Sequence, residues 1–310
     1  MPAITRAYLA VDIGGTKMLA GLVALDGRVI AQDRCETPST NVWDALARLV
    51  RSVQSATGGV ELIACGVGCG GPMSHAGDKV SNLHITEWND FPLRSSLATL
   101  TGLPTFVDND AKAIVLGETW CGAAVGHRDV IGMVVSTGVG GGIICDGDLL
   151  DGDTGNAGHI GHVNVVPNGR RCKCGARGCL EAVASGTAIA AMTGRPAAEA
   201  TPQVIRQTGT YVGRAVASVA TLLDLRLAVI GGSVALGFGA PFYEAAQAEV
   251  DRYTRIKFAR GVLVRPTGLG ADAPLIMRGL FYKLIDFSNT LLPNIFKPTG
   301  INSRINTRYS

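Results

Sequence analysis

Several features that point to particular classes of protein are scarce in this sequence. Charged residues make up only 17% of its 310 positions, aromatic residues 5%, and the formal net charge is +3. So small a positive charge over this length forms no basic stripe, and we expect no nucleic-acid partner. Long apolar runs are also lacking, because stretches such as "LAVIGGSVALGFGAPF" are broken by glycines and a proline. We therefore expect no membrane span.

An export signal is missing as well. The N-terminus "MPAITRAYLAVDIGG" has no basic segment followed by an apolar stretch, so we expect a cytoplasmic protein. In that compartment the eight cysteines should be thiols or metal ligands rather than disulfides. Five of them lie in scattered apolar contexts and are expected to be structural: Cys35, Cys65, Cys69, Cys121 and Cys145.

The sequence does contain many apolar residues and glycines. Apolar residues make up 47%, enough for a substantial core, and the 41 glycines cluster in short runs after apolar segments. Strand-like and helical patterns alternate, which predicts two α/β domains that face a cleft. We place the N-terminal domain at residues 1–118 and the C-terminal domain at 119–280. Residues 281–310 contain no alanine or valine and form an atypical tail of unknown role.

Three of these strand-to-glycine turns could bind a nucleotide. "DIGGTK" lies between two apolar strands, so Gly14, Gly15 and Thr16 could bring donors to an anion, and Asp12 could hold a magnesium-bound water. "STGVGGG" repeats this chemistry in the second half. "VIGGS" is a third turn, where a missing side chain would let a flat ring approach. A tight hairpin is the alternative interpretation of the first turn.

The segment "VDNDAKA" places Asp108, Asn109 and Asp110 at a strand end. Strand ends open onto ligand sites in α/β folds, and a carboxylate there could be the general base for a hydroxyl, as a kinase requires. The alternative is a helix N-cap, since Asp and Asn are favoured there, and one of the three residues could serve as one.

Four potential metal ligands follow within a short segment. His162, Cys172, Cys174 and Cys179 are enough for a closed tetrahedral zinc site, which leaves no open position and predicts a structural metal. This set has no place for His159, the first histidine of "GHIGH".

Together these motifs resemble the ROK (repressor, open reading frame, kinase) family of bacterial sugar kinases and regulators. The resemblance runs from about Tyr8 to Leu280 through "DIGGTK", "GCGGP", "VDNDAKA", "STGVGGG", "GHIGH", "CKCGARGCLE" and "VIGGS". It implies the actin-like ATPase (RNase H-like) fold, with two domains around a central cleft. It also implies phosphoryl transfer from ATP with Mg2+ to the 6-hydroxyl of a hexose or N-acetylhexosamine, and a homodimer or homotetramer.

The resemblance also implies roles for individual residues. Asp110 would be the catalytic base. The nucleotide phosphates would be bound by Asp12, Gly14, Gly15, Thr16, Lys17, Thr137 and Gly138, and the adenosine by Gly231 and Gly232. The sugar would be bound by Gly71, Asn82, Asn109, Asp110, His159, His162 and Glu181, with zinc shaping the loop that carries the last three.

The chain departs from the family at two positions near the site. His159 stands where most members have glutamate, and Lys112 stands where asparagine is frequent. Histidine at 159 and "EWN" at 87–89 are similar to bacterial N-acetylmannosamine kinases, so N-acetylmannosamine and glucose are both candidate substrates. A histidine with no role in the surface loop is the alternative for His159.

Two other functions stay open at this point. One is a sugar-sensing regulator, although only a few residues precede the first strand, so we expect no helix-turn-helix domain. The other is a catalytically idle sugar-binding protein. ATP and polyphosphate are both possible phosphoryl donors.

Overall fold

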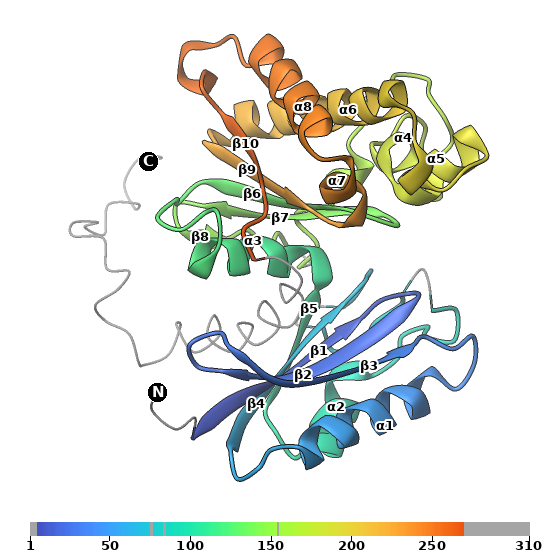
Figure 1. The fold of residues 1–310 in the computed structure, drawn as a ribbon, viewed down its shortest axis with the longest axis vertical. Helices are drawn as coiled ribbons and strands as arrows, with labels where there is room; N and C mark the ends of the chain where they lie inside the picture. Colours follow the sequence, from blue (N-terminus) through green and yellow to red (C-terminus); the bar gives the residue numbers. More distant parts are fainter. Residues whose placement is uncertain (1–4, 75–76, 83–84, 154, 270–310) are drawn as a thin grey trace, which may run out of the picture.

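The computed structural model describes residues 5–74, 77–82, 85–153 and 155–269. Two five-stranded mixed sheets lie one above the other in Figure 1, and they have the same topology. The first has the order β3-β2-β1-β4-β5 and the second the order β10-β9-β6-β7-β8. In each sheet three successive strands form an antiparallel meander, and two later strands add in parallel beside its first strand.

The strands of the first sheet are β1 (Arg6–Ile13), β2 (Lys17–Ala24), β3 (Val29–Glu36), β4 (Glu61–Cys69) and β5 (Thr105–Asn109). Those of the second are β6 (Val130–Val135), β7 (Val139–Cys145), β8 (Asp148–Leu149), β9 (Leu227–Gly231) and β10 (Leu263–Pro266). The α-helices are α1 (Val42–Ser55), α2 (Leu93–Thr101), α3 (Asp110–Cys121), α4 (Glu181–Ala184), α5 (Gly186–Thr193), α6 (Pro202–Leu223), α7 (Ser233–Phe238) and α8 (Ala240–Tyr253). Short 3-10 helices are η2 (Ile160–His162), η3 (Ala197–Glu199) and η4 (Lys257–Ala259).

Helices α1 and α2 cover one face of the first sheet (Figure 1). The apolar positions of α1 recur at helical spacing, so Leu46, Leu49, Val50 and Val53 are buried against the sheet while the opposite face is polar. Helix α2 ends at Gly102, whose φ of 70° is the left-handed conformation typical of a helix C-terminus.

Helix α3 connects the two halves. It begins directly after β5 of the first sheet and packs on β6 and β7 of the second (Figure 1). Its residues Ala113 to Leu116 share a buried cluster with Val130, Ile144, Leu227 and Val229 of the second half. The domain division predicted after residue 118 therefore falls within a helix whose apolar side chains belong to the second core.

The second sheet is covered on both faces, by α3 on one side and by the later helices on the other (Figure 1). Helices α6 and α8 pack closely there, since Gly209 and Gly213 of α6 lie against the α8 backbone. Arg214 joins them through an ion pair with Glu249, with 2.6 Å between Nε and Oε1. Among the described residues, no helix is both long and apolar enough to cross a membrane. The predicted tail, 281–310, lies outside the described residues.

Candidate active site and metal centre

The ends of β4 and β5 bring predicted sugar contacts together. The two strands are parallel and pair Cys69 with Asn109, so the chain leaves both at the same edge. A Cβ added to Gly71 would lie 3.5 Å from Nδ2 of Asn109, which places that backbone against the asparagine amide. Asn82 is buried beside it and its Nδ2 lies 3.4 Å from Cys69 Sγ. Gly71 and Asn109 therefore lie together, and Asn82 lies against Gly70 and Cys69 next to them, while their contact with a sugar stays a prediction.

Asp110 is the first residue of α3, directly after Asn109. Its side chain lies outside the described part of the structure, so its role as base stays a prediction. The preceding carboxylate, Asp108, is half-buried and its Oδ1 accepts a hydrogen bond of 2.6 Å from the Asn109 N–H. Burial raises the pKa of Asp108, and the Lys112 ammonium and the Asn109 N–H offset part of that rise.

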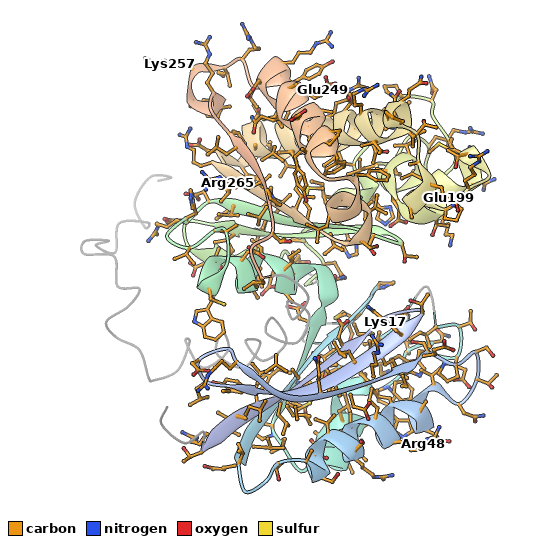
Figure 2. The ribbon with its side chains drawn as sticks, in the orientation of Figure 1. Lys17, Arg48, Glu199, Glu249, Lys257 and Arg265 are labelled. Atoms are coloured by element: carbon orange, nitrogen blue, oxygen red, sulfur yellow. The ribbon has the colours of Figure 1, made fainter. Side chains whose placement is uncertain are left out.

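The "DIGGTK" turn joins β1 to β2. Its hairpin closes with a 3.0 Å hydrogen bond from the Gly14 N–H to the Lys17 carbonyl, which leaves Gly15 and Thr16 exposed at the tip. Figure 2 shows Lys17 at the end of the first sheet that is nearer the second half. Asp12, on β1, pairs in register with Gly68 of β4 and is half-buried. Because its N–H closes the hairpin, Gly14 is less suited than Gly15 or Thr16 to donate to a phosphate.

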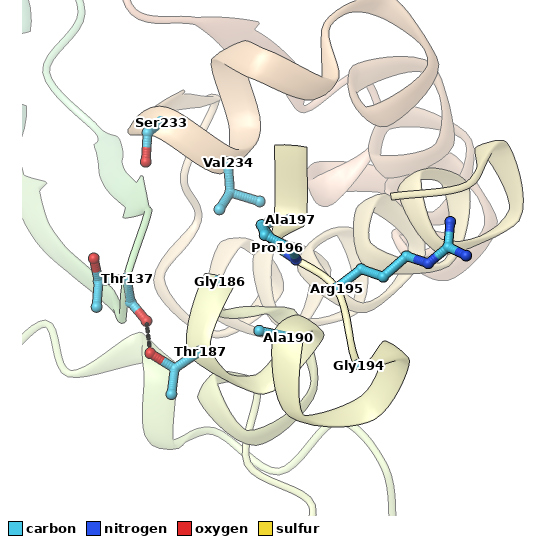
Figure 3. Close-up of a pocket in the computed structure, with 10 residues that line it drawn as sticks. All are labelled: Thr137, Gly186, Thr187, Ala190, Gly194, Arg195, Pro196, Ala197, Ser233 and Val234. Atoms are coloured by element: carbon cyan, nitrogen blue, oxygen red, sulfur yellow. Dashed lines mark hydrogen bonds between the residues drawn. The ribbon is translucent and has the colours of Figure 1, made fainter. Parts of the chain in front are cut away.

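The second glycine turn, between β6 and β7, lies beside a pocket of about 500 Å³ (Figure 3). The Thr187 hydroxyl donates to the Thr137 carbonyl oxygen at 2.9 Å, and the Ser136 and Ser233 hydroxyls are 2.9 Å apart. These contacts join the ends of β6, α5 and α7. The pocket is lined by Thr137, Gly186, Thr187, Ala190, Gly194, Arg195, Pro196, Ala197, Ser233 and Val234.

Most residues that line this pocket were not singled out from the sequence. Gly232 has a φ of 95°, and a Cβ there would lie 2.4 Å from the Val135 carbonyl oxygen, so only glycine fits where β9 turns into α7. Gly231 is buried, and a Cβ there would contact Thr267. The two glycines thus shape the backbone next to the pocket, while Ser233 and Val234 line it. Helix α5 follows its N-cap residue Ser185, whose hydroxyl oxygen accepts a hydrogen bond from the Ala188 N–H.

The four predicted metal ligands lie together in the structure. Their ligand atoms, from His162, Cys172, Cys174 and Cys179, are all within 4.8 Å of one another. Nδ1 of His162 is 3.7 Å from Cys172 Sγ, and Cys174 Sγ is 3.7 Å from Cys179 Sγ. Zinc–sulfur bonds of about 2.3 Å in a tetrahedron separate ligand atoms by about 3.8 Å. The donor set and its spacing therefore fit a zinc ion.

The two histidines of "GHIGH" lie on one short turn. His159 directly precedes η2 and His162 ends it, with their ring centroids 6.0 Å apart. The turn is held against β7, because a Cβ added to Gly161 would lie 2.2 Å from the Val139 carbonyl oxygen. His162 belongs to the metal cluster, whereas His159 is exposed beside it. The turn therefore places His159 next to the metal cluster, of which His159 is not a member.

Glu181, the first residue of α4, takes a position that the sequence did not suggest. Its Oε2 accepts a hydrogen bond of 3.1 Å from the Val139 N–H and lies 3.1 Å from where a Cβ of Gly138 would be. This carboxylate thus links the end of the cysteine-rich loop to the β6–β7 turn. A contact with sugar stays a prediction for Glu181.

Comparison with known proteins places this architecture in a family. A sequence model of the ROK family matches residues 8–282. The chain is 40% identical to a glucokinase of Thermotoga maritima over 183 residues, which is 58% of each protein. It is 36% identical to an N-acetylmannosamine kinase of Salmonella arizonae over 250 residues, or 74% of this chain and 84% of that one.

A solved structure supports the same assignment. The ROK family glucokinase from Streptomyces griseus, in complex with glucose and AMPPNP, superposes with a TM-score of 0.76 at 29% identity, over 88% of this chain and 98% of that one. The duplicated sheets are therefore the actin-like ATPase fold that the motifs predicted. The chain belongs to the ROK family, in which the two curated relatives named above are sugar kinases.

Proposed function

We propose that this chain is an ATP-dependent kinase that phosphorylates the 6-hydroxyl of a hexose or N-acetylhexosamine. The observation that carries the proposal is the meeting of Gly71 and Asn109 at the paired ends of β4 and β5, with Asp110 next in the chain. A hydroxyl held by the first two would lie beside a carboxylate able to take its proton. The curated relatives, a glucokinase and an N-acetylmannosamine kinase, support the proposal that this hydroxyl belongs to a sugar.

The proposed reaction requires little covalent chemistry from the protein. Asp110 takes the proton of the 6-hydroxyl as that oxygen forms a bond to the γ-phosphorus, and the bond from this phosphorus to the β–γ bridging oxygen breaks to release ADP. Donors of the exposed tip, Gly15 and Thr16, and of the Thr137–Gly138 turn would stabilise the phosphate oxygens. The pocket beside Thr137 would hold the adenosine.

Two metal ions belong to this proposal. Mg2+ would arrive with ATP and neutralise phosphate charge, and Asp12 would hold it through water. Zn2+ would be structural, with His162, Cys172, Cys174 and Cys179 as its four ligands. Because Nδ1 of His162 faces the cysteines, its Nε2 would be the nitrogen directed at the sugar.

The choice of hexose rests on few residues. Two residues of "EWN" have structural contacts: Glu87 accepts hydrogen bonds from the Asn41 and Val42 N–H groups at the start of α1, and Trp88 stacks on Phe91. Because these contacts explain both residues without a sugar, "EWN" gives only weak support for N-acetylmannosamine. His159 remains the candidate selector, since neutral imidazole both donates and accepts hydrogen bonds whereas the usual glutamate only accepts.

A coupled assay of ADP release tests the proposal. It uses glucose, mannose, N-acetylglucosamine and N-acetylmannosamine with ATP or polyphosphate as donor. We expect turnover with glucose or N-acetylmannosamine, and loss of turnover with retained sugar binding in Asp110→Asn. Asp44→Asn, an exposed change on α1, is the matched control and should keep full activity.

Other results of the sugar panel, or of a gel shift with DNA, would support other functions. Sugar binding without turnover on any hexose would favour the idle sugar-binding protein, and sugar-dependent retention of DNA in a gel shift would favour a regulator. Assembly as a homodimer or homotetramer and a cytoplasmic location remain predictions. Light scattering of the purified chain measures the first.

A further inference from the structure

A lysine is buried within the candidate site. Lys112 lies in the first turn of α3, two positions after Asp110, and only 1% of its side chain is exposed. Its Nζ lies 2.7 Å from Asp151 Oδ1, 2.8 Å from the Gly155 carbonyl oxygen and 3.6 Å from Asp108 Oδ1. The ammonium donates hydrogen bonds to the first two of these oxygens, and the Asp108 carboxylate lies within ion-pair distance. Lys112 is therefore placed to bind protein oxygens rather than a substrate.

These three oxygens come from two segments that carry predicted sugar contacts. Asp108 precedes Asn109 and Asp110 at the end of β5. Asp151 and Gly155 lie in the loop after β8, which leads to His159 and then η2. The Ala157 N–H donates to the Asp151 carbonyl oxygen at 2.9 Å, which closes this loop into a compact turn. Lys112 thus connects the β5 end to the loop that precedes the histidines.

The lysine itself is fixed from the other side. A Cβ added to Gly142 of β7 would lie 2.6 Å from Lys112 Cα, so the helix backbone packs directly on the second sheet at this position. A buried cation requires paired charges, and two carboxylates supply them here. The arrangement holds one charge between the end of β5 and the loop after β8, and Lys112 is 39 residues from Asp151 in the sequence.

We infer that Lys112 is a positioning residue, which sets the distance between the sugar contacts at the end of β5 and those of the "GHIGH" turn. The inference rests on the proposed sugar kinase function. Lys112 acts through Asp108, Asp151 and the Gly155 carbonyl, so it governs how tightly the sugar is held. The pocket beside Thr137 and Thr187 involves none of these groups, so the ATP site should be insensitive to the change.

Lys112→Met is the direct test, because it removes the charge and keeps most of the side-chain volume. We expect the KM for the sugar to rise about tenfold or more, while the KM for ATP stays within about twofold. An unchanged sugar KM in a folded Lys112→Met protein overturns the inference and leaves the kinase proposal intact. If the wild-type chain turns over no hexose, the kinase proposal fails and the inference fails with it.

Asp151→Asn keeps the test decisive if Lys112→Met does not fold. The Asp151 side chain is 63% exposed, so this change should not unfold the protein, yet it replaces the charged partner in the shortest contact of Lys112 by a neutral amide. We expect a smaller rise in sugar KM in this variant. The exposed neighbour Asp153→Asn is the matched control and should match wild type. Equal sugar KM in the Asp151 and Asp153 variants overturns the inference.

A double variant shows whether Lys112 and Asp151 act on the sugar KM together or independently. If Lys112 acts through Asp151, Lys112→Met with Asp151→Asn should have the same sugar KM as Lys112→Met alone, because Lys112→Met has already removed the ion pair. Multiplicative losses in the double variant overturn this coupling. Thermal unfolding of the wild type and all four variants shows whether any change in KM accompanies a loss of fold.

Discussion

The exposed cysteine of the cluster, Cys174, allows the metal centre to be tested without disturbing the core. Its Sγ lies 3.7 Å from that of Cys179, inside the set of four ligand atoms. An exposed substitution with no special role changes the free energy of unfolding by about 0.5 kcal/mol or less. A larger effect of Cys174→Ser must therefore come from the lost thiolate rather than from packing.

The expected loss follows from the affinity of such sites. Structural zinc binds zinc-finger peptides with an apparent free energy of roughly 10–16 kcal/mol, which is about 3 kcal/mol for each of four ligands. A loss of about 3 kcal/mol weakens zinc affinity about a hundredfold. Since the loop from His159 to Glu181 contacts β7 and the β6–β7 turn, the loop should loosen when zinc is lost.

Zinc affinity is measured by competition with a chromogenic chelator, and loop order by limited proteolysis. Cys121→Ser is the matched control, since Cys121 is also exposed but lies at the end of α3, outside the cluster. We expect Cys174→Ser to bind zinc about a hundredfold more weakly and to be cleaved faster within 163–180. Equal zinc affinity of the two variants, or a wild-type chain that binds no zinc, would refute the reasoning.

Three further predictions concern the sugar, the nucleotide and pH. His159→Glu should change the ratio of kcat/KM for glucose and N-acetylmannosamine by about tenfold or more at constant zinc content; an unchanged ratio would show that His159 is not a selector. Ala190→Trp should fill the pocket beside Thr137 and raise the KM for ATP about tenfold or more, with sugar binding unchanged. Ala198→Trp, at an exposed position close to the pocket in the sequence, is the control and should have no effect. A normal KM for ATP in Ala190→Trp would show that the nucleotide binds elsewhere. Burial raises the pKa of Asp108, the Asp151 carboxylate adds to this rise, and the Lys112 ammonium opposes it. The folded state therefore holds the Asp108 proton more tightly than the unfolded chain does. The free energy of unfolding should then fall as the pH rises from about 4 through the pKa of Asp108 in the folded state. Asp108→Asn should lack that loss in urea titrations at each pH, and parallel curves for the two proteins would contradict the assignment.

Several predictions depended on motifs that are local in the sequence. The four metal ligands fall within 18 positions of one another, so the loop that contains them can bring them together with little help from the rest of the chain. The strand-to-glycine turns were equally visible, since an apolar run followed by glycines is a local pattern. Strand β3 was not predicted, because its half-exposed edge sequence "VIAQDRCE" lacks a clear apolar alternation.

The partners of single side chains depended on the tertiary structure. Sequence placed Lys112 only as a departure from the family, and packing of α3 on β7 brought its ammonium to Asp151. The pocket beside Thr137 combines residues from the β6–β7 turn, α5 and α7. The sequence of any one of these segments does not indicate that it lies beside the other two. Glu181 likewise met the Val139 N–H through the path of a loop.

The sequence by itself therefore determined the family, the α/β fold and the cluster of four residues that could hold a metal ion, because each depends on patterns within one short segment or on their order along the chain. Only the tertiary structure decided which segments meet at the site. Such contacts join residues far apart in the chain, and their geometry is set by how α3 and the two sheets pack, which no local pattern encodes. Lys112 shows the difference most clearly, since the same residue would be an exposed cation on an isolated helix and is here buried between Asp108 at the end of β5 and Asp151 in the loop after β8.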